Sequence, residues 1–162
     1  MRTGTLLAAS AGVVLLLGLY AIYPPLPLVD SGEYDTTAVT LRSENGSELA
    51  TVDVRIADTE DKRRIGLSRT ESLDNGSGML FVHDEPGSYG YVMRGMSFGL
   101  DIIFIDIDGT VTEIHDAPEP DGEYEETYGG YGRYVLEVPR GYAASVGLSE
   151  GDTVNIPDEA RG

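Results

Sequence analysis

Cysteine is absent from the 162-residue sequence, and its absence excludes several kinds of chemistry. The chain can have no disulfide, no thiolate nucleophile, no cysteine-ligated zinc and no lipid attached through a lipobox cysteine. The Gly-x-Ser-x-Gly nucleophile elbow, the Walker loop and the dinucleotide-binding glycine fingerprint are missing as well. Stability must therefore come from a hydrophobic core. Because these motifs are missing, the sequence gives no sign of the reactions that they support.

Basic residues are also scarce, while acidic residues are spread along the chain. Lys and Arg together number 11 against 28 Asp and Glu, which gives a net charge of −17, and Lys62 is the only lysine. Nucleic acid is a poor partner for such a chain, because phosphate backbones need a basic surface. The balance resembles that of proteins from salt-loving organisms, in which concentrated salt screens repulsion between like charges. We therefore expect a halophile-like domain, with an ordinary acidic domain as the alternative.

An uncharged, mostly apolar stretch occupies residues 5–23, shortly after Arg2. Its length is close to the roughly 20 residues with which a helix spans a bilayer. Because it lacks a convincing A-x-A cleavage site, residues 1–24 are predicted to be a transmembrane anchor, with a cleaved signal peptide and secretion as the alternative. Arg2 favours a single-pass orientation in the cell membrane, with the rest of the chain outside the cytoplasm. Residues 25–35 are then a linker, and residues 36–162 form one domain.

The clearest strand signal lies within residues 90–114. The unbroken apolar run of residues 102–105 is followed by the turn Asp106-Ile107-Asp108-Gly109 and by a β-branched run at residues 110–114. Asp-Gly supplies the left-handed backbone that a tight hairpin needs. These two runs are therefore predicted to pair antiparallel.

Further strands and two short helices follow from similar patterns. Alternating apolar residues predict a half-buried strand over residues 50–56. Other strands are predicted at residues 78–82, 133–138 and 153–156, and helices at residues 59–65, capped by Asp58, and 139–146. Residues 117–132 are acidic and rich in Gly and Tyr, which predicts either a loop that covers a ligand or an ordinary solvated loop. The order predicts a mainly β fold, an antiparallel β-sandwich or barrel (jelly-roll-like) with two short helices, after the N-terminal transmembrane helix.

Several short motifs occur in an order that is typical of one family. Within residues 54–154 they include Thr59-Glu60-Asp61-Lys62-Arg63, Gly78-Met79-Leu80-Phe81-Val82, Tyr91-Val92-Met93-Arg94, Leu100-Asp101-Ile102-Ile103-Phe104, Asp108-Gly109-Thr110-Val111, Val135-Leu136-Glu137-Val138 and Gly147-Leu148 with Gly151-Asp152. Together they resemble the domain-of-unknown-function 192 family of bacteria and archaea. The resemblance implies a compact, mainly β domain and no established reaction. The chain departs from the family at Gly95 and Met96, where relatives usually carry Asn and Thr, and at Gly99, where they usually carry Pro.

Two arginines stand out within these motifs, because basic residues are so few. Arg63 and Arg94 are expected to receive an anionic or polyhydroxyl small ligand, with Asp101 orienting them and Tyr91 as an apolar wall. With Met93 on the same rim, the predicted ligand-binding residues are Arg63, Tyr91, Met93, Arg94 and Asp101. The alternative for Asp101 is structural, since a carboxylate beside a core needs a salt bridge or a backbone partner.

Metal binding is considered for two sets of residues. His83 and His115 are the only histidines, and each is followed by an aspartate, Asp84 or Asp116. They could hold a divalent ion if their strand ends were adjacent. The turn at residues 106–109 lacks the later oxygen ligands of a calcium loop, so it favours a hairpin. We predict no metal site and no cofactor.

These features together predict an uncharacterised membrane-anchored extracytoplasmic domain that serves as a small-ligand or glycan binding module, or as an accessory module, rather than as an enzyme. One alternative is an envelope-polymer hydrolase with Asp101 as general acid or base. The other is a structural module that docks on a membrane complex through an apolar patch.

Overall fold

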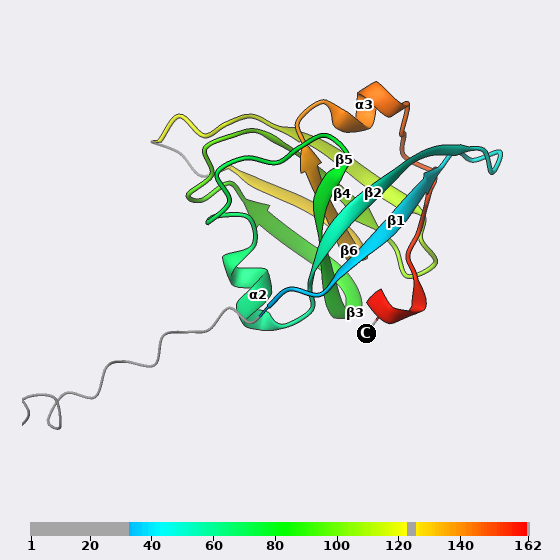
Figure 1. The fold of residues 1–162 in the computed structure, drawn as a ribbon, viewed down its shortest axis with the longest axis horizontal. Helices are drawn as coiled ribbons and strands as arrows, with labels where there is room; N and C mark the ends of the chain where they lie inside the picture. The colour runs from blue at the N-terminus through cyan, green and yellow to red at the C-terminus, as the bar shows by residue number, and fades with distance from the viewer. Residues whose placement is uncertain (1–32, 123–125, 162) are drawn as a thin grey trace, which may run out of the picture. The chain divides into compact units, whose positions relative to one another are not determined.

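Strands of the described chain form one sheet that curls around itself (Figure 1). The structure is a computed structural model and describes residues 33–122 and 126–161. The strands are β1 (Thr36–Arg42), β2 (Glu48–Ala57), β3 (Ser77–Val92), β4 (Leu100–Ile105), β5 (Val111–Ala117), β6 (Thr127–Pro139) and β7 (Thr153–Asn155). Their order in the sheet is β5-β4-β6-β3-β2-β1-β7. Neighbours run antiparallel except β2 and β3, which are parallel.

The two edges of the sheet meet at one end, so the sheet approaches a closed barrel. Thr110, just before β5, forms a bridge with Thr153 at the start of β7. Beside it, the Val154 N–H donates to the Gly109 carbonyl at 2.8 Å. The predicted mainly β fold with two short helices is thus confirmed. The predicted transmembrane helix lies outside the described residues, and within those residues no helix is long and apolar enough to cross a membrane.

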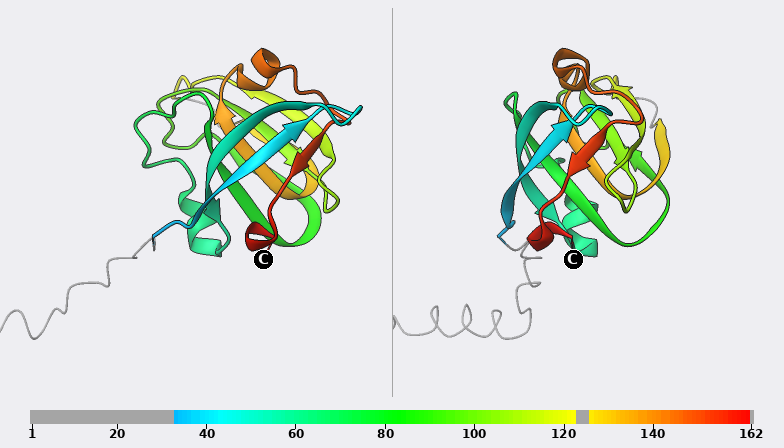
Figure 2. Two further views of the ribbon diagram at one scale, coloured as in Figure 1. Left: turned by 45° about the vertical axis from the view of Figure 1, so that its right-hand side comes forward. Right: turned by 90° about the vertical axis from the view of Figure 1, so that its right-hand side faces the viewer.

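Two short α-helices lie at opposite ends of the barrel (Figure 2). They are α2 (Glu60–Ile65) and α3 (Tyr142–Val146), and a 3-10 turn, η1 (Asp158–Ala160), follows β7. The predicted cap of α2 is wrong by one residue: the Thr59 hydroxyl accepts the Lys62 N–H at 3.2 Å, whereas Asp58 pairs with the Lys62 side chain. The predicted start of α3 at Pro139 is also wrong, because β6 continues through Pro139 and Gly141 caps the helix.

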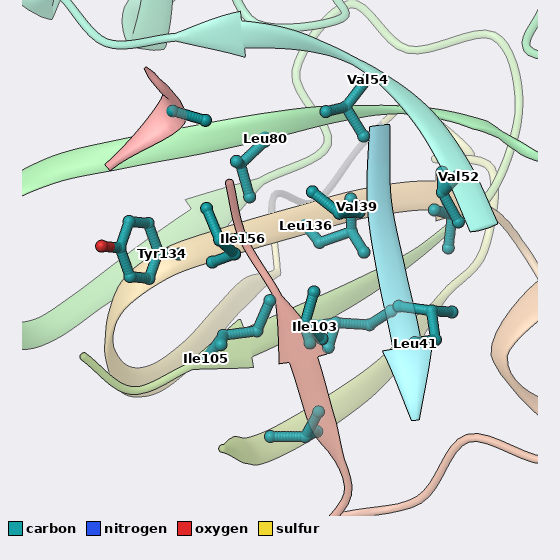
Figure 3. Close-up of a cluster of buried hydrophobic side chains, with 14 of the residues drawn as sticks. Val39, Leu41, Val52, Val54, Leu80, Ile103, Ile105, Tyr134, Leu136 and Ile156 are labelled. Carbon is teal, nitrogen blue, oxygen red and sulfur yellow. The ribbon is translucent and has the colours of Figure 1, made fainter. Parts of the chain in front are cut away.

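Apolar side chains lie on both faces of β4, which explains the unbroken apolar run of residues 102–105. Ile103 and Ile105 belong to a first cluster inside the curl, together with side chains from β1, β2, β3 and β6 (Figure 3). Leu100, Ile102 and Phe104 alternate with them and belong to a second cluster on the other face of the strand. As predicted, β4 pairs antiparallel with β5, and Gly109 has the left-handed φ of 92° that the turn requires.

The second cluster is covered by the outer parts of β3 and β6, which pair as a ribbon. Residues 87–92 of β3 pair with residues 127–132 of β6, beyond a register shift between Val82 and Gly87. The prediction of a surface loop over residues 117–132 is therefore wrong for its last third, and Tyr128 is buried. Gly132 lets the ribbon lie close to β4, because a Cβ there would meet the Ile105 carbonyl oxygen at 2.4 Å.

Candidate functional site

A cleft of about 610 Å³ opens beside the second cluster. One wall is α2 with the turn after it, and the other is the outer part of β3 with residues 94–96. Its buried lining includes Phe81, Leu100 and Glu137, so a carboxyl group lies among apolar side chains at depth. The volume of the cleft is within the range of clefts that hold small molecules.

Glu137 is the most unusual residue of the cleft. It lies on β6 between Met79 of β3 and Ile102 of β4, and only 6% of its surface is exposed. No residue that the structure describes donates a hydrogen bond to its carboxyl group or forms an ion pair with it. Burial raises the pKa of Glu137 to about 8, because a low-dielectric environment disfavours the charged form. At neutral pH the carboxyl group therefore mostly keeps its proton and can donate a hydrogen bond.

Arg63 provides a fixed cation on the α2 wall. Its Nη1 donates to the Val82 carbonyl at 2.6 Å and to the Asp58 carbonyl at 2.9 Å. Both acceptors are backbone carbonyls and not carboxylates. The Nη2 and Nε groups of Arg63 have no partner among the described residues. Because backbone carbonyls hold the guanidinium without neutralising it, its positive charge remains available to a ligand.

Tyr91 and His83 form a neutral pair on the β3 wall. The Tyr91 hydroxyl and His83 Nε2 lie 2.9 Å apart and share a hydrogen bond. Burial, and then the nearby charge of Arg63, lower the pKa of His83 to about 4, so the imidazole is neutral at pH 7. Burial, and then the charge of Glu137, raise the pKa of Tyr91, so its hydroxyl stays protonated. The imidazole ring also stacks on Tyr89, with ring centroids 3.5 Å apart.

The predicted ligand-binding residues separate into two groups. Arg63, Tyr91 and Arg94 line the cleft. Met93 does not line this cleft; it is 6% exposed and packs in the second cluster.

Asp101 lies elsewhere. It is 3% exposed and alternates along β4 with the residues of the second cluster, so its side chain is on the opposite face. Its two carboxylate oxygens accept the Gly141 N–H at 2.9 Å and the Ala143 N–H at 2.8 Å. Asp101 therefore satisfies backbone donors at the start of α3, at the end of the barrel opposite α2 (Figures 1 and 2).

Glu137 and His83 are cleft residues that sequence reasoning did not select for the site. Glu137 is one of 28 acidic residues, and its only distinguishing signal is its position inside the apolar run of residues 135–138. His83 was considered as a metal ligand with His115. In the parts of the chain that the structure describes, no three His, Asp or Glu side chains gather as a metal site.

Comparisons with known proteins agree with this fold. A search among curated proteins finds none that matches the chain. Two solved structures are similar, each with a TM-score of 0.69. One, from Sinorhizobium meliloti 1021, is described as a candidate transcription regulator; it is 28% identical, and the match covers 76% of this chain and 95% of that one. The other is a protein of unknown function from Novosphingobium aromaticivorans DSM 12444; it is 27% identical, and the match covers 81% of this chain and 90% of that one.

The family comparison extends over most of the described domain. The model of the DUF192 family, described as "Uncharacterized ACR", matches residues 40–156, which include every described residue that lines the cleft. The match covers more than half of the chain. This protein therefore belongs to the uncharacterised DUF192 family.

Proposed function

We propose that the domain is a binding module whose cleft holds a small polar ligand. The observation that carries the proposal is Glu137, a buried carboxyl group that lines the cleft and has no partner in the described chain. Burying a carboxyl group without a hydrogen-bond partner costs free energy, so an unpartnered carboxyl group at the depth of a cleft is a candidate contact for a polar ligand.

Arg63 supports the same function from the α2 wall. Its guanidinium is anchored by two backbone carbonyls, and the cleft leaves it facing a potential ligand. A preorganised cation binds an anionic or polyhydroxyl group at a low entropic cost, because few rotamers are lost. The aromatic wall formed by Phe81 and Tyr91, whose ring centroids lie 5.0 Å apart, would hold the apolar part of the ligand.

The two alternative functions receive less support from this geometry. A hydrolase that uses Asp101 would need a free carboxylate in a cleft, but both Asp101 oxygens accept backbone N–H groups. A docking module would need a broad apolar patch. The exposed large apolar side chains of the described residues are Val92, Ile107 and Tyr131, which lie on different elements.

A ligand panel tests the proposed function. Full-length protein in detergent and high salt would be titrated with butyrate, inorganic phosphate, glycerol and a disaccharide, and binding would be followed by chemical-shift changes of isotope-labelled protein. We expect at least one anion or polyol to perturb residues of the cleft. Arg63→Lys, which keeps the charge but loses the planar guanidinium, should weaken that binding several-fold.

Arg64→Lys is the matched control, because Arg64 lines the same cleft but pairs with Asp61 on the surface. It should bind the same compound as the wild type does. If no compound perturbs the cleft, or if both variants behave alike, the binding function is contradicted.

A further inference from the structure

No cation among the described residues forms an ion pair with Glu137, although Arg63 lines the same cleft. Arg63 contacts β3 at Val82, whereas Glu137 is opposite Met79, three residues away, which is roughly 10 Å along a strand. The two side chains form no ion pair, and burial is the cause of the raised pKa of Glu137. The cleft therefore has a fixed positive group at one place and a potential negative group at another.

Tyr91 lies near enough to Glu137 and Arg63 for the charges of both to affect it. The charges of both Glu137 and Arg63 act on its pKa, in opposite directions. Its ring makes an edge contact with Phe81, and Phe81 lies two residues from Met79, the neighbour of Glu137 on β3, so these aromatic rings share a face of the sheet with Glu137. Aromatic faces together with a carboxylate form a favourable environment for an ammonium group. The net charge of −17 also attracts cations to the molecule as a whole.

We infer that the ligand of this cleft is a small zwitterion, with an ammonium group that pairs with Glu137 and an anionic group that pairs with Arg63. This inference rests on the proposed function and specifies its ligand class. An ammonium group satisfies the carboxyl oxygens that no described residue satisfies. The anionic group occupies the free Nη2 and Nε donors of Arg63.

Binding of such a ligand releases a proton. The ammonium group favours the ionised form of Glu137, so the proton of its carboxyl group passes to solvent when the ion pair forms. The titratable and charged side chains that line the cleft are Glu60, Arg63 and Arg64 from α2, His83, Tyr89 and Tyr91 from β3, and Arg94 after β3. His83 and Tyr91 keep their neutral forms between pH 6.5 and 9, so Glu137 is the group whose proton is exchanged in that range.

A series of ω-amino acids tests this inference on the full-length protein. The probes are glycine, 4-aminobutyrate and 6-aminohexanoate, whose charges are progressively farther apart, with butyrate and 1-butylamine as single-charge controls. We expect one amino acid of the series to bind at least tenfold more tightly than either single-charge compound. Its affinity should rise about tenfold per pH unit from pH 6.5 towards pH 8 and then level off, since one proton is released. Chemical-shift titrations at each pH provide the affinities.

Glu137→Gln should abolish both the gain in affinity and its pH dependence. Glu71→Gln, which removes an exposed acidic group outside the cleft, should keep both. If no amino acid of the series binds better than butyrate, or if wild-type affinity does not rise with pH, the inference is overturned even where Glu137→Gln fails to fold. Butyrate or a polyol would then still bind if the proposed function is right, whereas the absence of binding by every probe would overturn both.

Discussion

At the scale of single residues, burial determines the chemistry of Glu137 and Asp101. Both are acidic residues within apolar strands, and both are buried. Asp101 has two backbone N–H donors, whereas Glu137 has no donor among the described residues, and its pKa is raised to about 8. Asp101 therefore stabilises the fold, while Glu137 destabilises it at neutral and higher pH.

The raised pKa of Glu137 predicts a pH dependence of stability. The folded state keeps this proton up to about pH 8, whereas the unfolded state loses it near the ordinary value of 4.5, so the free energy of unfolding falls as pH rises between them. The lowered pKa of His83 makes the free energy of unfolding rise with pH, but only between about pH 4 and 6.5. Urea unfolding between pH 6.5 and 8 should therefore show the wild type losing up to about 1.4 kcal/mol per pH unit.

Glu137→Gln should remove most of this loss, because glutamine does not titrate. Glu60→Gln, at an exposed position, should keep it. If the free energy of unfolding changed with pH in the same way for the wild type and for Glu137→Gln, Glu137 would not keep its proton in the folded state.

The partners of Asp101 predict a loss of stability without a loss of ligand binding. In Asp101→Asn one side-chain oxygen is replaced by an amide that cannot accept the Gly141 or Ala143 N–H, so a buried donor loses its partner. We expect the free energy of unfolding to fall by about 1–3 kcal/mol. Asp116→Asn, at an exposed aspartate that pairs with Arg140, should cost much less. If Asp101→Asn kept full stability but lost ligand binding, Asp101 would belong to the binding site.

At the scale of elements, the ribbon of β3 and β6 depends on glycines that admit close contact. A Cβ at Gly132 would meet the backbone of Ile105, with the carbonyl oxygen at 2.4 Å and the carbonyl carbon at 2.9 Å. Gly132→Ala should lower the free energy of unfolding by about 1–3 kcal/mol, because backbone cannot move aside as a flexible side chain can. Unfolding by denaturant would measure the difference in free energy between Gly132→Ala and the wild type.

Gly129 on the same strand provides the control. The nearest atom to a Cβ there would be the Tyr89 carbonyl oxygen at 3.9 Å, so Gly129→Ala should be tolerated. Equal losses for the two substitutions would mean that the ribbon does not lie against β4 as described. Because Tyr89 and Tyr91 on the ribbon line the cleft, this contact also positions the β3 wall.

At the scale of the whole molecule, the charge of −17 predicts a dependence on salt. Like charges repel one another in dilute buffer, and salt screens them at a Debye length that falls from about 10 Å at 0.1 M to about 3 Å at 1 M. We propose that the domain is adapted to concentrated salt, so its Tm should rise by several degrees between 0.1 and 2 M NaCl. Circular dichroism would follow the transition. A Tm that stays constant or falls would favour an ordinary acidic domain.

We also propose that residues 1–24 anchor the protein in the cell membrane, with the domain outside the cytoplasm. The expected result is that the protein sediments with membranes, is released by detergent but not by salt, and is digested by protease added to intact cells. The mass of the mature protein decides between an intact anchor and a cleaved signal. Protein of full-length mass that stays in the soluble fraction would contradict both forms of the proposal.

The amino-acid sequence by itself determined the parts of this protein that depend on near neighbours. The apolar alternation of β2, the β4–β5 hairpin with its Asp-Gly turn and the approximate place of α2 were confirmed, because period-two patterns and turn residues act within a few positions. The predicted loop over residues 117–132 was wrong at its end, since the partner of β6 in the ribbon lies some 40 residues earlier in the chain.

Only the tertiary structure decided which acidic residue is buried in the cleft. The surroundings of Glu137 come from Met79 and Ile102, distant in sequence, and the donors to Asp101 come from residues about 40 positions later. Solvation and hydrogen bonding depend on what lies nearby in space, so two carboxyl groups with similar local sequences acquire opposite roles. The sequence determined the strands on which the two residues lie, and the packing of those strands determined that Asp101 has backbone donors while Glu137 has no partner among the described residues.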